Sequence, residues 1–307
     1  SELIIHGSLS AQGTEADPIV FTSSSANPAK GDWYGIRVLA DSSNESVTLS
    51  HCTVEYGSVG IVVSANTYSA QVHISDSKIR HTSGNGISIS GDGGSKVAVD
   101  VSNNEVTDNS GKGIYCYVTG GTSSASTELS GSITGNTISA NGSYGLYVYT
   151  KGNYNKSNLE IGDNTIQGNH DYGVYLYSDN TRWIKSTFNV HDNVIYGNGT
   201  GLYCYANGSS LSVKIVDNEI YQGTEGIYCH HYCYWGNSTH NYPFYAVISG
   251  NKVHENTARG IYCYSDYKYQ RMYVEITGND IYNNGNHGIQ CSRDSSCLLY
   301  TSPSPRD

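Results

Sequence analysis

Short segments in which apolar and polar residues alternate recur along the chain, and a glycine opens each of them. Four of these segments read GIYCY at 113–117, GLYVY at 145–149, GVYLY at 173–177 and GLYCY at 201–205. A period of two is typical of a β-strand that buries one face. The pattern therefore predicts short strands along the whole chain and no long helix.

Two landmarks place these segments in one repeat. The step from one opening glycine to the next ranges from 25 residues, between Gly35 and Gly60, to 34 residues, between Gly226 and Gly260. An Asn followed two residues later by Val or Ile stands eight or nine residues before the next glycine, whereas the stretch from glycine to Asn varies in length. A repeat of this size indicates a solenoid whose loops lie in the variable part. The Asn landmarks are Asn104, Asn136, Asn164, Asn193, Asn218, Asn251 and Asn279.

Strand-only repeats of this length cannot cover their own apolar face, but parallel coils stacked about 4.8 Å apart bury a continuous interior. The composition agrees, because 35 Gly, 28 Tyr, 5 Pro and 1 Met among 307 residues favour strands and turns over helix. The chain resembles the right-handed parallel β-helix repeat family, which has the pectate-lyase-like architecture, over residues 3 to about 292.

The opening stretch GSLSAQGTEADPIVFTSSSANPAKGDWYGIRV is similar to the first coils of secreted bacterial members of that family. The resemblance implies an all-β protein with a single right-handed parallel β-helix of about ten coils over residues 1–296, truncated at both ends. It also implies an exported protein that is extracellular, at the cell surface or periplasmic. Residues 297–307, CLLYTSPSPRD, abandon the repeat pattern, and we expect them to be a non-native tail translated from a sequencing adapter.

The recurring Asn is expected to point inward at a turn and to bond main-chain groups of its own and the next coil, as an asparagine ladder. Cys52 and Ser77 occupy the equivalent earlier positions. A second Asn set, five residues after the first, suits turn positions with positive φ. Its members are Asn109, Asn141, Asn169, Asn198, Asn256 and Asn284.

Alternation turns the tyrosines of the GIYCY segments outward while the aliphatic residues and cysteines fill the interior. Ser88 and Ser90 stand at the same positions one coil earlier, and Gln290 and Ser292 one coil later, so the fold does not require Tyr there. Exposed aromatic surfaces usually mark sites that bind a ligand or a partner. The alternative explanation is structural, since Tyr is favoured in β-strands. One expected column is Tyr115, Tyr147, Tyr175, Tyr203, Tyr228 and Tyr262, and the other is Tyr117, Tyr149, Tyr177, Tyr205, His230 and Tyr264.

A row of phenols suits the binding of sugar rings, so we expect a polysaccharide or glycan surface as the partner; contact with a protein or a mineral is the alternative. The longest variable stretch, from Cys229 to Tyr245, adds aromatic and His side chains beside basic residues of neighbouring coils. The expected binding residues are Tyr147, Tyr149, Tyr175, Tyr177, Trp183, Tyr203, Tyr205, His231, Trp235, Tyr262 and Tyr264.

Catalysis is the second hypothesis. A glycosidase needs two carboxylates facing one cleft, but the columns contain none, and Asp179 and Asp266 are expected in separate loops. A uronate lyase or C5-epimerase instead needs an acid, a base and a cation to neutralise the uronate carboxylate. Tyr228 and His230 are the candidate proton-transfer pair, and Lys268 and Arg271 are the candidate cations. A structural adhesin stalk is the third hypothesis.

Signals for metals and other partners are weak. Cys229 is expected to point inward and His230 outward, so they cannot readily share an ion, and we predict no transition-metal site. The geometry of in-register parallel strands rarely suits a disulfide, so we predict that the cysteines are free thiols. A column of Asp163, Asp192 and Asp217 suits either Ca²⁺ or turns that favour Asp. A net charge of -10 without a basic stripe argues against nucleic acid, and no apolar run is long enough to span a bilayer.

Overall fold

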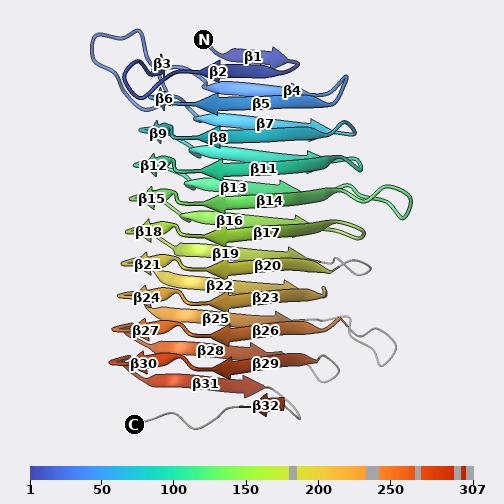
Figure 1. Ribbon diagram of the computed structural model, residues 1–307, viewed down its shortest axis with the longest axis vertical. Helices are drawn as coiled ribbons and strands as arrows, with labels where there is room; N and C mark the ends of the chain where they lie inside the picture. The colour runs from blue at the N-terminus through green and yellow to red at the C-terminus, as the bar shows by residue number, and fades with distance from the viewer. Residues whose placement is uncertain (180–184, 233–241, 267–270, 294–298, 302–307) are drawn as a thin grey trace.

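The computed structural model describes residues 1–179, 185–232, 242–266, 271–293 and 299–301. The chain winds into a solenoid in which each coil contributes one strand to each of three parallel sheets (Figure 1). Strand β1 lies at one end of the solenoid axis and β31 lies near the other. The prediction of a single all-β parallel β-helix is confirmed.

Sheet A holds the glycine-opened segments, and all its neighbouring strands pair in parallel. Its strands are β1 (Leu3–His6), β4 (Ile36–Ala40), β7 (Ile61–Asn66), β10 (Ile87–Asp92), β13 (Ile114–Val118), β16 (Leu146–Lys151), β19 (Tyr172–Asp179), β22 (Thr200–Asn207), β25 (Glu225–Tyr232), β28 (Arg259–Ser265) and β31 (His287–Arg293).

Sheet B follows sheet A in each coil. Its strands are β2 (Leu9–Gln12), β5 (Glu45–Ser50), β8 (Ala70–Ser75), β11 (Lys96–Ser102), β14 (Glu128–Thr134), β17 (Lys156–Gly162), β20 (Ser186–His191), β23 (Leu211–Val216), β26 (Phe244–Ser249), β29 (Met272–Thr277) and β32 (Leu299–Thr301).

Sheet C closes each coil with short strands. These are β3 (Ile19–Phe21), β6 (Cys52–Glu55), β9 (Lys78–Arg80), β12 (Glu105–Thr107), β15 (Thr137–Ser139), β18 (Thr165–Gln167), β21 (Val194–Tyr196), β24 (Glu219–Tyr221), β27 (Lys252–His254) and β30 (Asp280–Tyr282).

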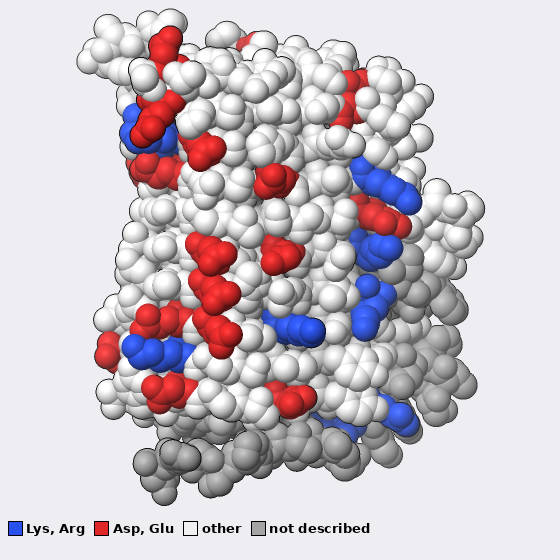
Figure 2. Space-filling view, in the orientation of Figure 1, with Lys and Arg blue, Asp and Glu red and all other residues white. Residues whose placement is uncertain are grey.

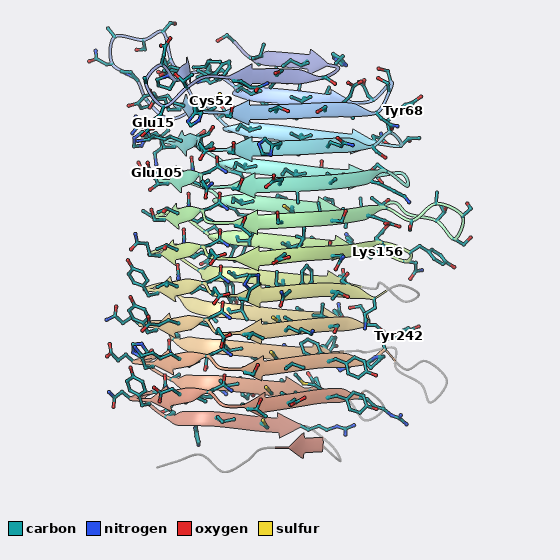
Figure 3. The ribbon with its side chains drawn as sticks, viewed as in Figure 1. Glu15, Cys52, Tyr68, Glu105, Lys156 and Tyr242 are labelled. Carbon is teal, nitrogen blue, oxygen red and sulfur yellow. The ribbon has the colours of Figure 1, made fainter. Side chains whose placement is uncertain are left out.

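In the first coil the long connection 22–35 joins sheet C to sheet A, but from β4 onward the connections between sheets A and B carry the length variation, as the repeat predicts. They project from one side of the solenoid, and Lys156 and Tyr242 lie on that same side (Figures 1 and 3). The segment between β13 and β14, for example, spans 119–127, whereas β5 and β6 are separated by His51 alone. The loops therefore gather along one edge of sheet A.

The core is a column of inward side chains that are in register from coil to coil. Ile114, Leu146 and Val174 are aligned on three successive strands of sheet A, and each is completely buried. Burying such a side chain contributes roughly 1.5–3 kcal/mol. Because every coil repeats this arrangement, the interior is continuous along the axis.

The asparagine ladder is confirmed and lies at the turn between sheets B and C. Asn193 Nδ2 donates to Asn218 Oδ1 at 2.9 Å and to the main-chain oxygen of Ile161 at 2.9 Å, while the Asn164 N–H donates to Asn193 Oδ1 at 3.0 Å. Ser77 replaces Asn at the N-terminal end, where its Oγ accepts from the N–H of Cys52 at 2.9 Å. Each coil is thus bonded to the next through a buried polar side chain.

The second Asn set differs from the prediction. Asn141 is buried, and its Nδ2 donates to Asn169 Oδ1 at 2.9 Å, so this set forms a second ladder. Positive φ falls one residue earlier, as at Asp108 with +53° and Ala140 with +52°. The turn needs one residue with positive φ and, directly after it, an Asn whose side-chain amide points inward. The prediction assigned both properties to the Asn position. Asn193 and its equivalents likewise follow a left-handed residue.

Candidate functional site

The outward side chains of six consecutive strands of sheet A form an aromatic surface, which we call the Tyr platform. Strand pairing places Tyr115, Tyr147, Tyr175, Tyr203, Tyr228 and Tyr262 in one column, and Tyr117, Tyr149, Tyr177, Tyr205, His230 and Tyr264 in the other. Each of these side chains is partly exposed, and the residues between them are buried. Both predicted columns are therefore confirmed as geometry.

Neighbouring rings of the platform are nearly parallel and close. The ring centroids of Tyr147 and Tyr175 are 4.9 Å apart with an interplanar angle of 13°, and those of Tyr149 and Tyr177 are 4.7 Å apart with an angle of 8°. This is the geometry of offset stacking, in which each ring covers much of its neighbour's face. The surface therefore presents ring edges and phenol hydroxyl groups.

A third column, which the sequence analysis missed, extends the platform at the start of these strands. Tyr144 packs against Tyr147 with centroids 5.1 Å apart, and Tyr172 stacks on Tyr203 at 5.3 Å. Each of these tyrosines stands two residues before the first inward residue of its strand, where strict alternation would turn it inward, so alternation could not have found them. The column widens the aromatic surface over the middle coils.

Two cations lie at opposite ends of this third column. Lys112 Nζ lies 4.8 Å from the ring centroid of Tyr115, and the Arg259 guanidinium lies 3.6 Å from that of Tyr262. Arg259 also pairs with Glu225, with Nη2 and Oε1 2.6 Å apart. The positive charges thus rest on the electron-rich faces of the end rings.

Burial controls the electrostatics of the phenols. It raises the pKa of Tyr115 to about 12, and it raises the pKa values of Tyr147, Tyr175 and Tyr203 further, with a smaller contribution from neighbouring tyrosines. All of these hydroxyl groups therefore stay protonated and neutral near pH 7. A neutral phenol both donates and accepts hydrogen bonds, but it is not a base under these conditions.

His230 bonds to a different tyrosine from the one expected. Its ring is parallel to that of Tyr228, with centroids 5.6 Å apart, but its Nδ1 lies 3.0 Å from the hydroxyl oxygen of Tyr203. Burial lowers the pKa of His230 to about 4, so the imidazole is neutral near pH 7. The structure thus assembles a Tyr203–His230 pair within the platform.

Asp179, which was expected in a loop, lies in a strand instead. It is the last residue of β19 and is 8% exposed. Its Oδ2 accepts from the hydroxyl of Tyr149 at 3.0 Å, and its Oδ1 accepts from Asn207 Nδ2 at 2.9 Å. A carboxylate is therefore part of the edge of the platform next to the loops.

The other predicted site residues do not all reach the surface. His231 points inward and is 0% exposed, so the expectation that it contacts a ligand is wrong in this conformation. Arg271 is exposed and precedes β29, outside the platform columns. Trp183, Trp235 and Lys268 lie outside the described residues.

The column of Asp residues lies at turns, and the cysteines form no disulfides among the described residues. Asp163, Asp192 and Asp217 have φ of +56°, +54° and +55°, which confirms the turn explanation for this column. Figure 2 shows acidic side chains in a file along the axis on the face drawn there. Among the described residues, no group of three or more His, Cys, Asp or Glu side chains is arranged to hold a metal ion. The cysteines of the described residues are free thiols: Cys52, Cys116, Cys204, Cys229, Cys263 and Cys291.

Comparisons with known proteins concern the fold. A solved structure similar to this chain is the A-module of the mannuronan C-5 epimerase AlgE6 from Azotobacter vinelandii, with 14% identity, a TM-score of 0.32, and coverage of 89% of this chain and 92% of that one. Curated protein sequences gave no significant match. The described part of the chain has no helix long and apolar enough to cross a membrane. A profile described as a right-handed β-helix region matches residues 34–241 and 130–302, and the chain therefore belongs to the right-handed β-helix family.

Proposed function

We propose that the Tyr platform binds an extended polysaccharide or cell-surface glycan along the solenoid axis. The observation that carries the proposal is the unbroken register of aromatic side chains over six coils, in a fold that accepts Ser at the same positions one coil away. Six strands at about 4.8 Å spacing give a contact length on the order of 25 Å. A ligand of repeating units matches a surface of repeating rows.

The chemistry of the platform suits hydroxyl-rich ligands. Neutral phenols offer both a donor and an acceptor at every row, and the ring edges provide apolar contact between them. Asp179 and Asn207 add an acceptor and a donor at the edge of the platform. Binding in this mode depends on hydrogen bonds to sugar hydroxyls and on edge contacts, because the ring faces are largely occupied by other rings.

The test is retention of the folded protein on a panel of neutral and acidic glycans. The Tyr175→Ser and Tyr177→Ser double variant carries the residues found at Ser88 and Ser90, and we expect it to lose most of the retention. The matched control is the Tyr245→Ser and Tyr273→Ser double variant, which removes a stacked pair with centroids 4.9 Å apart on sheet B. Equal retention by both double variants would refute the proposal.

A uronate lyase or C5-epimerase is the second candidate, and the Tyr203–His230 hydrogen bond is the observation that favours it. The proposed roles are proton transfer by Tyr228 and His230 and clamping of a uronate by Lys268 and Arg271. The raised phenol pKa values oppose it, because a protonated Tyr228 is not a base near pH 7. New ultraviolet absorbance from unsaturated uronates during the glycan incubation would identify a lyase, and altered uronate stereochemistry would identify an epimerase.

The location of the protein follows from the same proposal. Glycan surfaces of this extent lie outside the cytoplasm, so we infer an exported protein that acts in the periplasm, at the cell surface or outside the cell. Fractionation of the source cells with an antibody against the solenoid tests this inference. Absence of both glycan retention and turnover would favour the structural adhesin stalk.

A further inference from the structure

Two phenols of the Tyr platform are hydrogen-bonded to bases. Tyr203 lies 3.0 Å from His230 Nδ1, and Tyr149 donates to Asp179 Oδ2 at 3.0 Å. When the phenol is the donor in the first pair, Nδ1 is unprotonated and the imidazole proton is on Nε2. A phenol that loses an electron becomes a very strong acid, so a base within hydrogen-bond distance decides which ring is oxidised most readily.

Stacked rings connect the two base-paired phenols without a gap. The centroids of Tyr203 and Tyr205 are 5.8 Å apart, those of Tyr205 and Tyr177 are 4.9 Å apart, and those of Tyr177 and Tyr149 are 4.7 Å apart. A second path through the other column has centroid separations of 4.9 Å between Tyr203 and Tyr175 and 4.9 Å between Tyr175 and Tyr147. Electron transfer between rings falls steeply with distance, and these rings are in contact.

We propose that the Tyr platform is a one-electron relay in which Tyr203, paired with His230, is oxidised first and Tyr149, paired with Asp179, is the second stable position of the radical. The partner is a one-electron oxidant that approaches the platform from solvent, such as an oxidised metal complex or an enzyme-generated radical. This activity is independent of glycan binding, since it uses ring contacts and bases within the protein.

Oxidation of Tyr203 couples the loss of an electron to the transfer of a proton. The O–H bond of Tyr203 breaks, and the proton forms an N–H bond at His230 Nδ1. One electron passes to the oxidant, which is thereby reduced by one electron. The product is a neutral phenoxyl radical beside an imidazolium. Burial lowers the pKa of His230 to about 4. The imidazole is nevertheless a far stronger base than the oxygen of an oxidised phenol, so the proton moves to His230.

The second step moves the radical along the stack. Tyr149 supplies one electron through the intervening rings and its proton to Asp179 Oδ2, while His230 returns its proton to the oxygen of Tyr203. The net change is a radical on Tyr149 and a protonated Asp179, with Tyr203 and His230 restored. No electron or proton is left over.

The test is flash oxidation of the folded protein by photogenerated tris(bipyridine)ruthenium(III), with persulfate as the final electron acceptor, followed through the absorption and electron paramagnetic resonance of phenoxyl radicals. His230→Tyr restores the residue type of the other coils and removes the base, and Tyr203→Phe keeps the ring and removes the proton. Both variants are expected to form the radical several-fold more slowly than the unmodified protein. Tyr273→Phe on sheet B is the control and is expected to have no effect.

Two further readouts separate the relay from general oxidation of exposed phenols. The rate is expected to fall as pH drops through about 4, where His230 becomes protonated, and His230→Tyr removes that fall. A nitroso spin trap followed by peptide mapping is expected to mark Tyr149, and Asp179→Asn is expected to reduce that adduct. Unchanged rates in both Tyr203→Phe and His230→Tyr, with circular dichroism confirming folded protein, would overturn the proposal.

Discussion

The first coils of sheet A and the middle coils share a backbone and an interior but differ completely on the outside. Ile36, Ile61 and Ile87 are buried in the same column as Leu146 and its neighbours. The outward positions of the early coils hold Arg37, Val62 and Ser88 in one column and Leu39, Ser64 and Ser90 in the other, where the middle coils hold aromatic rings.

This difference separates what the fold requires from what the surface does. The two inward positions of each glycine-opened segment of sheet A hold only aliphatic residues and small thiols, because each is packed by the coils on both sides. Outward positions accept a cation, a hydroxyl or a ring in successive coils with no change of register. The tyrosines are therefore a property of the surface, and the following predictions test the two kinds of position separately.

Breaking the interior is expected to have the largest effect. Asn193→Leu leaves the main-chain N–H of Asn164 without its acceptor at 3.0 Å and the main-chain oxygen of Ile161 without its donor at 2.9 Å. With the bonds from Asn193 Nδ2 to Asn218 Oδ1 and to the main-chain oxygen of His191 also lost, the variant is expected to be destabilised by about 4 kcal/mol. Urea denaturation measures the loss. Ser77→Ala, at the N-terminal end of the same ladder, is the milder comparison, and a smaller loss in Asn193→Leu than in Ser77→Ala would contradict the ladder.

Acid is expected to destabilise the interior of the middle coils through His231. Burial, assisted by His230, lowers the pKa of His231 to about 3, and the main-chain oxygen of Tyr242 offsets this only in part. The unfolded chain takes up this proton first, so stability is full above about pH 6.5 and is lost as pH falls toward 3. The loss attributable to His231 is about 3 kcal/mol at pH 4.

His231→Ser tests this assignment, because Ser265 occupies the next position of the column. The variant is expected to be less stable at pH 7 but to lose less stability between pH 6.5 and 4. Denaturation midpoints measured across that range give the slope. The same slope in the variant and the parent protein would assign the acid sensitivity to other groups.

Removing rings from the platform is expected to cost less than breaking the interior. The Tyr175→Ser and Tyr177→Ser double variant loses stacking on both neighbouring coils, and the expected destabilisation is about 2 kcal/mol. Calorimetric unfolding and circular dichroism measure the effect. A failure to fold would show that the outward rings are structural after all.

Adding rings is expected to have the smallest effect on stability. Ser88→Tyr and Ser90→Tyr together extend the platform by one coil toward the N-terminus, next to Tyr115 and Tyr117. We expect a change in stability within about 1 kcal/mol and stronger retention on the bound glycan. Unchanged retention with normal folding would limit the binding surface to the existing coils.

Period-two alternation was sufficient to predict the parallel strands, the buried columns and the two outward columns of the GIYCY segments, because every coil is stabilised by the same local pattern. The turns were less predictable. In most turns one residue has positive φ, and the next residue is an Asn whose side-chain amide points inward. Asn is also favoured at positive φ, so residue type alone does not show which position has the positive φ. His231 was assigned to the surface because the strand was expected to end earlier, whereas β25 continues to Tyr232.

Side-chain partners across coils could be predicted least. Tyr203 bonds to His230 and Tyr149 to Asp179, over sequence separations of 27 and 30 residues. These pairs depend on how long each strand continues beyond its apolar residues and on the rotamers that packed rings adopt. Neither property leaves a periodic signal in one sequence. Residues 233–241 of the longest variable stretch, which include Trp235, lie outside the described residues.

The constant register between coils has an evolutionary consequence. Duplication of a single repeat, such as the 28 residues 145–172, would insert one complete row of rings and leave every other row in its own environment. Each added coil would lengthen the binding surface by about 4.8 Å, and the number of ligand units bound at once would rise with that length. Selection can in this way adjust avidity by copying DNA, without redesigning any individual contact.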